Sequence, residues 1–228
     1  MKLIKPTFVI SRDADSLTEA LKESPQTVTV WVRSGKFKNR FPLIRSTITY
    51  EAKSNADAKE YTKKFVATLP IPKTHIRLSV LKGITKHQIV QLLAYTKKDK
   101  LIKTFTHDVD RFKSKRTFTS WRNRRKIIYT LIDRKGKLLG IIWFDKKQFK
   151  NYKYTFAIRV YPPGRGKKIA RHFLATAYGN FKIRRKNPNL WLRTVKENAK
   201  ALKLYRHFGF KVTSEDSKNN EVLMTFRT

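Results

Sequence analysis

The chain of 228 residues contains no cysteine, so disulfide bonds and thiolate metal ligands are excluded. It also contains no apolar run near the roughly 18 residues that are needed to cross a bilayer. The brief apolar stretch that follows Met1 is too short for the core of a signal peptide. We therefore expect a cytoplasmic protein that does not enter a membrane.

Acidic residues are scarce, because 16 Asp and Glu stand against 53 Lys and Arg and the net charge is +37. A field of this strength attracts polyanions and repels cationic ligands. Residues 1–73 carry a net +7, whereas residues 74–228 carry +30. The charge serves a nucleic-acid, ribosomal or other anionic partner, or it is a compositional bias spread over solvated faces. Composition leaves both interpretations open.

Hydrophobic residues make up 40% of the chain and aromatic residues 12%, which is enough for a packed core. Two prolines at Leu69–Thr74 punctuate the chain, and we place a domain boundary there. Residues 1–73 contain no chemical motif and predict a small α+β extension of unknown role. Its expected elements are a strand at 8–10, a helix over 15–23, strands at 27–32 and 43–50, and a helix over 55–68.

In residues 74–228, strand-like and helix-like apolar patterns alternate along the chain. Their order is strand, helix, three strands, helix, strand, helix and two strands. Thr85 and Gln88 form a capping box at the first helix, and Gly179 and Gly209 are expected to end the second and third helices. This order predicts an α+β fold with a mixed sheet and helices on its faces.

The stretch Ile158–Gly179 leads from a strand into a helix through two prolines and two glycines. Pro162 and Pro163 cannot extend a sheet ladder, while the glycines allow the backbone to turn and to approach a ligand closely. A helix that begins near Lys168 would present free N–H groups and the positive end of its dipole. The stretch therefore predicts a pyrophosphate site, or else a plain connection with surface lysines. Its glycine spacing fits neither the Walker A loop nor the dinucleotide fingerprint.

Two motifs in this segment resemble the GNAT superfamily of acyl-CoA-dependent N-acetyltransferases. The family's first motif is Gln/Arg-x-x-Gly-x-Gly/Ala between a strand and a helix, and Arg165–Ala170 fits its first and last positions. Lys168 stands where the family has its middle glycine. The second motif, Asn-x-x-Ala-x-x-x-Tyr followed by Gly-Phe, is matched by Asn198, Ala201, Tyr205, Gly209 and Phe210. The resemblance covers residues 74–228 and implies a mostly antiparallel GNAT-type sheet.

The resemblance implies direct transfer of an acetyl group from the co-substrate acetyl-CoA to an amine. It implies that the CoA pyrophosphate is held by backbone amides of Arg165, Gly166, Lys167, Lys168, Ile169 and Ala170. Main-chain groups of Ile158, Arg159 and Val160 would pair with the pantetheine arm, and an N–H among them would stabilise the oxyanion. Because the backbone at Lys168 is helical in the family, we expect its Cβ to be tolerated.

Asn198 would bind the pantetheine arm by the same resemblance, although asparagine also serves as a helix N-cap. Tyr205 would be the general acid, since a phenol with a pKa of about 10 suits a thiolate whose conjugate acid has a pKa of about 8.5. The simpler interpretation of Tyr205 is an aromatic residue on an amphipathic helix. The histidines show no metal-ligand spacing, so no metal is expected.

The general base is weakly marked, because Tyr152–Val160 lacks the glutamate that many relatives carry on this strand. Asp145 and Asp108 are the better candidates, His107 is a third, and a water relay is an alternative. Each of these side chains also suits a surface or capping role. Cationic surroundings would lower the pKa of an acceptor amine and reduce the need for a strong base.

A second hypothesis starts from Arg111–Lys126, which interleaves Phe112, Phe118 and Trp121 with eight basic residues. Phe181–Lys186 adds another basic cluster. Such patterns hold RNA or single strands by stacking and charge, or they are core aromatics beneath a solvated basic face. The alternative function is therefore a catalytically weak or inactive GNAT-fold module that binds RNA or DNA. The acceptor amine is not identified by the sequence.

Overall fold

The protein is described by a computed structural model over residues 27–32, 46–51, 55–71, 77–122, 126–183, 185 and 188–227. The strand expected at 8–10 and the helix expected over 15–23 lie outside these ranges. The strands β1 (Thr27–Val32) and β2 (Ser46–Glu51) pair antiparallel with each other and form a separate two-stranded sheet.

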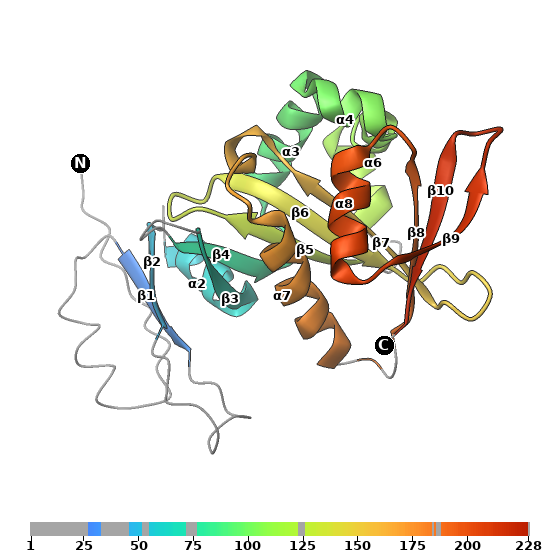
Figure 1. Ribbon diagram of the computed structural model, residues 1–228. Helices are drawn as coiled ribbons and strands as arrows, with labels where there is room; N and C mark the ends of the chain where they lie inside the picture. The colour runs from blue at the N-terminus through green and yellow to red at the C-terminus, as the bar shows by residue number, and fades with distance from the viewer. Residues whose placement is uncertain are drawn as a thin grey trace, which may run out of the picture.

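The main sheet has eight strands in the order β3-β4-β5-β6-β7-β8-β10-β9 (Figure 1). All neighbours in it are antiparallel except β7 and β8, which are parallel. The strand bounds are β3 (Phe65–Pro70), β4 (Arg77–Lys82), β5 (Ile127–Ile132), β6 (Leu138–Asp145), β7 (Tyr154–Val160), β8 (Leu190–Val195), β9 (Lys211–Asp216) and β10 (Glu221–Phe226).

Helices cover both faces of this sheet. One face carries α7 and α8, whose apolar side chains join one core cluster with the sheet, and the other carries α3 to α6, which join a second cluster. In Figure 1, α7 and α8 lie in front of the sheet and α3, α4 and α6 lie at its far side. The bounds are α2 (Asn55–Lys64), α3 (Lys86–Lys98), α4 (Lys100–Phe105), α5 (Asp108–Arg111), α6 (Lys115–Arg122), the 3-10 turn η1 (Pro162–Gly164), α7 (Ala170–Ile183) and α8 (Ala199–Phe208).

The predicted α+β class and the order of elements in residues 74–228 are confirmed, with three short helices added between α3 and β5. The predicted capping box is present, since Gln88 N donates to Thr85 Oγ1 and Thr85 N donates to Gln88 Oε1. Gly209 ends α8 with a left-handed φ of 103°. The additional helices α4 to α6 are too short for a periodic apolar stripe to reveal them.

Two expected helix ends are wrong. The helix expected over 55–68 stops at Lys64, and the chain continues as β3, which pairs with β4 at Leu69↔Leu78. The main sheet therefore extends across the boundary that we placed near residue 73. Gly179 does not end α7, because Ala177, Tyr178 and Phe181 continue one buried stripe past it. Within the described ranges, no helix is long and apolar enough to cross a bilayer.

Candidate functional site

Strand β7 is paired very differently on its two edges. Along β6 it keeps six register pairs, from Asp145↔Thr155 to Gly140↔Val160. Along β8 it has only two, Tyr154↔Leu190 and Thr155↔Trp191, although both strands continue for several residues. The two parallel strands therefore diverge, and we call the opening beside residues 156–160 the strand gap.

The strand gap exposes main-chain groups of β7 that another strand would normally pair. Tyr161 N donates to Leu139 O at 2.9 Å, so alternate residues such as Ile158 and Val160 direct their groups to the opposite edge. Arginine side chains cover the carbonyls there: Arg159 Nη1 donates to Ile158 O and Arg165 Nε donates to Val160 O, each at 3.0 Å. The edge thus resembles one that accepts an added strand.

The loop that follows β7 is anchored to the sheet at Gly164. A Cβ at this position would lie 2.8 Å from Leu139 O, so only glycine allows η1 to pack against β6. Gly164 was expected to permit close approach to a ligand, and its contact is instead internal. Gly166 has a φ of +76° with open space around it, which leaves the turn itself to this second glycine.

Lys168 adopts a left-handed backbone with a φ of +54°, and α7 begins two residues later at Ala170. The expectation that Lys168 starts the helix with a right-handed backbone is therefore wrong. A side chain in the left-handed region is strained because its Cβ approaches the following carbonyl. The lysine is exposed, so its charged end lies in solvent beside the loop.

The residues that lead into α7 leave several backbone amides free. The first helical bond runs from Phe173 N to Ile169 O at 2.9 Å. Among the described residues, no backbone acceptor pairs with the amides of 166–172. These amides, the positive end of the α7 dipole and the exposed side chains of Lys167 and Lys168 all favour a negatively charged group at this place. Its use for a pyrophosphate stays a prediction.

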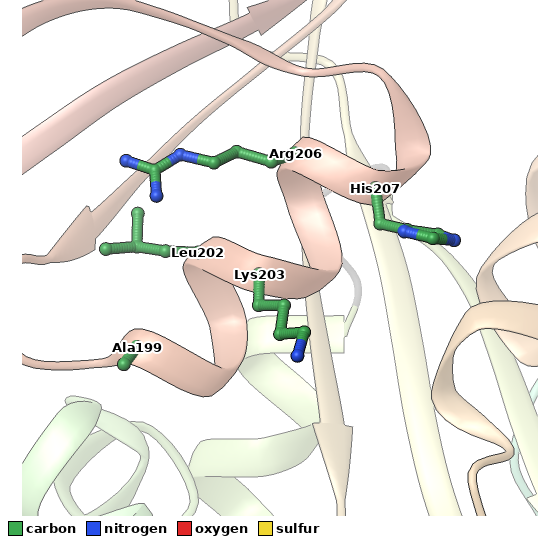
Figure 2. Close-up of a pocket in the computed structure, with 5 residues that line it drawn as sticks. All are labelled: Ala199, Leu202, Lys203, Arg206 and His207. Atoms are coloured by element: carbon green, nitrogen blue, oxygen red, sulfur yellow. The ribbon is translucent and has the colours of Figure 1, made fainter.

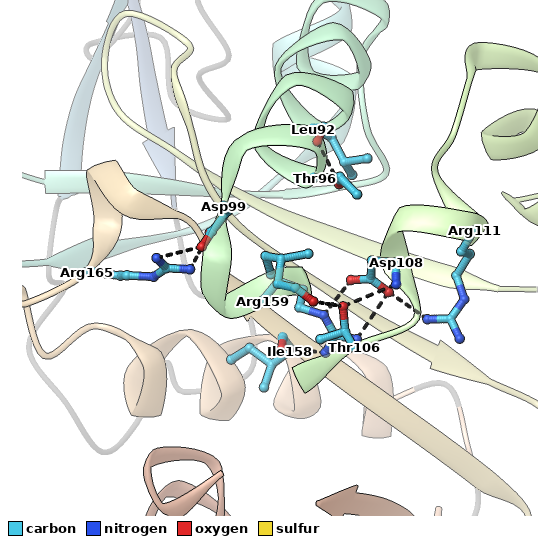
Figure 3. A network of polar contacts seen from close by, with 10 residues as sticks. Leu92, Thr96, Asp99, Thr106, Asp108, Arg111, Ile158, Arg159 and Arg165 are labelled. Atoms are coloured by element: carbon cyan, nitrogen blue, oxygen red, sulfur yellow. Dashed lines mark hydrogen bonds and ion pairs between the residues drawn. The ribbon is translucent and has the colours of Figure 1, made fainter. Parts of the chain in front are cut away.

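Arg165 is tied to a buried carboxylate on the other side of the loop (Figure 3). Its Nη1 donates to Asp99 Oδ1 at 3.0 Å, and its Nη2 donates to Asp99 Oδ2. Asp99 is 6% exposed and also accepts from Leu101 N, which caps α4. The guanidinium of Arg165 therefore fastens the loop to the start of α4. No local pattern predicts this contact, because 66 residues separate the two side chains.

Tyr205 lies on α8 beside the strand gap. It is 6% exposed, and its ring meets the Phe156 ring of β7 edge to face at a centroid distance of 5.6 Å. Burial raises the pKa of Tyr205, while the positive charge of Arg159 opposes that rise only in part. The phenol is therefore protonated at neutral pH, as a general acid must be. Asn198 caps the same helix by accepting from Ala201 N at 3.2 Å.

Asp108 is buried beneath the strand gap in an arginine network (Figure 3). Arg159 donates to it through Nε at 2.6 Å and through Nη2 at 3.2 Å, and Arg111 donates through Nη1 at 2.7 Å. Both carboxylate oxygens of Asp108 are thus occupied by guanidinium groups. The arrangement gives Asp108 the role of holding Arg159 in place, and its role as a base stays a prediction.

The other candidate bases lie away from the strand gap or in solvent. Asp145 binds Lys126 Nζ at 2.7 Å and stands opposite Thr155, at the closed end of β7. Three to five residues of extended strand separate this end from Ile158 and Val160, which is about 10–16 Å. His107 is exposed before α5. The described residues contain no group of three or more His, Asp and Glu that could hold a metal ion.

An open hollow of about 530 Å³ lies along the outer side of α8 (Figure 2). Its lining comes from one helix and consists of Ala199, Leu202, Lys203, Arg206 and His207. Tyr205 is not among its lining residues, but Leu202, which lines it, packs in the same core cluster as Tyr205. The exposed cations Lys203 and Arg206 make this side of the helix basic.

Comparison with protein families gives one match. A family model described as the acetyltransferase (GNAT) family matches residues 95–210, a little over half of the chain. This range includes the β7–α7 loop (residues 161–169), the strand gap and Tyr205. A search of curated protein sequences finds no match.

Solved structures share the fold at low sequence identity. A domain from Methanocaldococcus jannaschii is 18% identical, with a TM-score of 0.51, and the match covers 66% of this chain and 98% of that one. The yncA putative acetyltransferase from Salmonella typhimurium, solved with acetyl-CoA, is 16% identical with a TM-score of 0.53, covering 66% and 93%. Spermidine N-acetyltransferase from Vibrio cholerae, in complex with CoA and spermine, is 16% identical with a TM-score of 0.52, covering 66% and 95%.

Proposed function

The chain belongs to the acetyltransferase (GNAT) family of acyl-CoA-dependent enzymes, and we propose that it transfers an acetyl group from acetyl-CoA to an amine acceptor by direct attack. One observation carries the proposal: β7 and β8 pair at two positions and then diverge, with an anion-binding loop at the end of β7 and a protonated tyrosine beside the opening. Each of these features suits one part of acetyl-CoA.

The loop and the open edge account for binding. The free amides of residues 166–172 and the cations Lys167 and Lys168 would hold the pyrophosphate. The pantetheine arm would then lie along β7 like an added strand and pair with Ile158 and Val160. Because Arg159 and Arg165 cover the carbonyls of these residues, their guanidinium groups would shift slightly as the arm enters. The side-chain amide of Asn198 would face the arm from the start of α8.

Tyr205 and the β7 main chain account for the chemistry. The acceptor nitrogen forms a bond to the thioester carbonyl carbon, and a β7 N–H stabilises the oxyanion. The C–S bond then breaks, and the sulfur leaves with a proton from Tyr205 Oη. The phenolate that remains is stabilised by the nearby charge of Arg159 and regains a proton from the acceptor ammonium through water. Atoms and charge balance without a covalent enzyme intermediate.

Deprotonation of the acceptor would not require a free carboxylate. Arg159 and Arg111 share the single carboxylate of Asp108, so this side of the strand gap keeps a net positive charge. A positive environment lowers the pKa of an amine and raises the fraction that is neutral and nucleophilic. This account favours a water relay over Asp108 or Asp145 as the route for the proton.

Calorimetric titration with acetyl-CoA tests the proposal without knowledge of the acceptor. We expect saturable binding by the wild-type chain and a loss of about tenfold or more in affinity for K167E/K168E, because reversed charge repels phosphate. K146E/K153E, which changes two exposed lysines of the β6–β7 connection by the same amount, is the matched control. Absence of saturable binding by wild-type protein would overturn the proposal and favour the non-catalytic alternative.

A further inference from the structure

The helices α3 to α6 segregate charge between their inner and outer sides. Their outer side carries nine exposed cations, which we call the basic helical face: Lys86, Lys97, Lys98, Lys100, Lys103, Lys113, Lys115, Arg116 and Arg122. Asp110 is the exposed acid among the described residues of these helices. The outward field of this layer is therefore almost entirely positive.

The other two acids of the layer are turned inward and neutralised. Asp99 binds Arg165, and Asp108 binds Arg159 and Arg111. None of the nine exposed cations forms an ion pair with any described residue. Their charges are thus available to an external anion, whereas Glu197 and Glu215 are exposed among the cations of the C-terminal strands and α8.

The aromatic residues of the layer are not available for stacking. Phe112 and Phe118 are 0% exposed and Trp121 is 8% exposed, and their rings pack on one another. Of the two interpretations of this segment, core aromatics beneath a basic surface is confirmed for these three residues, and they do not stack on bases. The layer also lacks an exposed Asn or Gln in residues 86–122, the side chains that pair with the edge of adenine.

We propose that the basic helical face binds the phosphate backbone of double-stranded RNA. A single strand is held mainly by stacking on exposed Phe, Tyr or Trp rings, and residues 86–122 expose none of these. An anionic membrane would need exposed aromatic or clustered apolar side chains, and the exposed apolar residues here are the separate aliphatics Val90, Leu101 and Val109. An A-form duplex is recognised by shape and backbone contacts rather than by base reading, which fits a broad surface of lysines.

The position of this face relates it to the strand gap. Asp99 and Asp108 belong to the same helical layer and contact the β7–α7 loop and β7 from the inside. A duplex on the outer side would therefore lie next to the acetyl-transfer site and not on α7 and α8. The proposal rests on surface charge alone and does not depend on acetyl transfer.

Fluorescence anisotropy with a labelled RNA duplex of about 16 base pairs tests the proposal. The full chain is titrated between about 50 and 200 mM salt, so that each variant yields an affinity and a salt slope. K98E/K103E/K113E reverses three charges of the basic helical face. K146E/K150E/K153E removes three exposed lysines of the β6–β7 connection and is the matched control. Calorimetry with acetyl-CoA on both variants reports separately on folding and on the proposed enzyme site.

The proposal predicts that the first variant loses affinity by about tenfold or more and that its salt slope becomes shallower by about 2–3, because each phosphate contact contributes about 0.9 to the slope. The control should lose less than about threefold, since distant charges are screened. Equal losses in the two variants would overturn the proposal, because binding would then follow net charge. Binding to duplex DNA of the same sequence, or to phosphatidylserine vesicles, as tight as to RNA would also overturn it.

Discussion

The two edges of β7 differ in how their main-chain groups are paired. On the β6 side, six register pairs satisfy the main chain and fix the strand in the sheet. On the β8 side, pairing stops after two positions, and side chains take over the role of a neighbouring strand. The sheet therefore lacks main-chain pairing along the edge of β7 where the proposed pantetheine arm would supply it.

Two buried tyrosines on neighbouring helices also differ in their surroundings. Tyr178 on α7 is 7% exposed, and its hydroxyl is buried without a hydrogen-bond partner among the residues that the structure describes. Tyr205 on α8 is 6% exposed, but it lies beside the strand gap and interacts with Arg159. Burial is nearly equal, so differences between variants at these positions report on the surroundings and not on burial.

The largest effect on stability is expected at Asp108. Its carboxylate holds Arg159, which covers the edge of β7 that has no neighbouring strand. Asp108→Ala should lower the free energy of unfolding by about 3–5 kcal/mol, because it leaves the largely buried guanidinium of Arg159 unpaired. Urea denaturation measures the change. Asp110→Ala, two residues away and exposed, should stay within about 0.5 kcal/mol of wild type. A similar stability for both variants would show that β7 does not need Asp108.

Removal of the hydroxyl group should have different effects on the reaction rate at the two tyrosines. Tyr205→Phe should reduce the rate of CoA release from acetyl-CoA and an acceptor by about 100-fold or more, as loss of a general acid does. Tyr178→Phe removes the same atom at the closed side and should leave the rate within about twofold. Binding of acetyl-CoA should persist in both variants. Equal rates in Tyr205→Phe and wild type would remove Tyr205 from the reaction.

Removal of the Tyr178 hydroxyl should also change the stability of the protein. Tyr178→Phe should raise the free energy of unfolding by about 1 kcal/mol, because a sealed hydroxyl without a partner is costly. Burial raises the pKa of Tyr178 to about 12, above its unfolded value of about 10. Ionisation of Tyr178 therefore does not affect the free energy of unfolding below pH 10, and it lowers that free energy as the pH rises from about 10 to 12.

Urea titrations at pH 8 and pH 11 measure this term. The advantage of Tyr178→Phe over wild type should grow between the two values, since the phenylalanine has no proton to lose. An advantage that is constant with pH would contradict the raised pKa. Tyr61, whose pKa is also raised by burial, stays in both proteins and cancels in the difference.

The smallest effect concerns the loop at the open end of β7. Lys168→Gly should raise the free energy of unfolding by about 0.5–1 kcal/mol, because glycine adopts the left-handed backbone without strain and offsets its larger unfolded-state entropy. Lys167→Gly removes the same charge at a position without positive φ and should be neutral or destabilising. Thermal denaturation ranks the two variants. A loss of stability in Lys168→Gly would show that the lysine side chain stabilises the loop.

Sequence patterns predicted the local features of this protein and missed the distant ones. The order of strands and helices, the capping box at Thr85 and the end of α8 at Gly209 follow from residues that are near neighbours in the chain. The pairs Asp99–Arg165 and Asp108–Arg159 join residues that are 66 and 51 positions apart, and no local period indicates them. The left-handed backbone of Lys168 is set by the loop around it, against the preference of the residue itself.

The helix end at Lys64 shows the same limit. The sequence of α2 continues without a break signal, and the change to β3 is fixed by pairing with β4 and by the contact between Tyr61 Oη and Ser79 Oγ at 2.7 Å. Tertiary contacts override a weak local preference at such positions. The strand gap itself was expected only by resemblance, since no single residue marks where two strands part.

Asp99 has a consequence of its own, because one carboxylate oxygen serves two partners. Oδ1 accepts from Leu101 N at the start of α4 and from Arg165 Nη1 in the loop that precedes α7. Because the two hydrogen bonds share one oxygen atom, a shift of this carboxylate would disturb both the cap of α4 and the anchor of the loop. If acetyl-CoA binds at the loop and an RNA duplex binds on α4, as proposed, Asp99 would link the two sites, and each ligand would change the affinity of the other by the same factor.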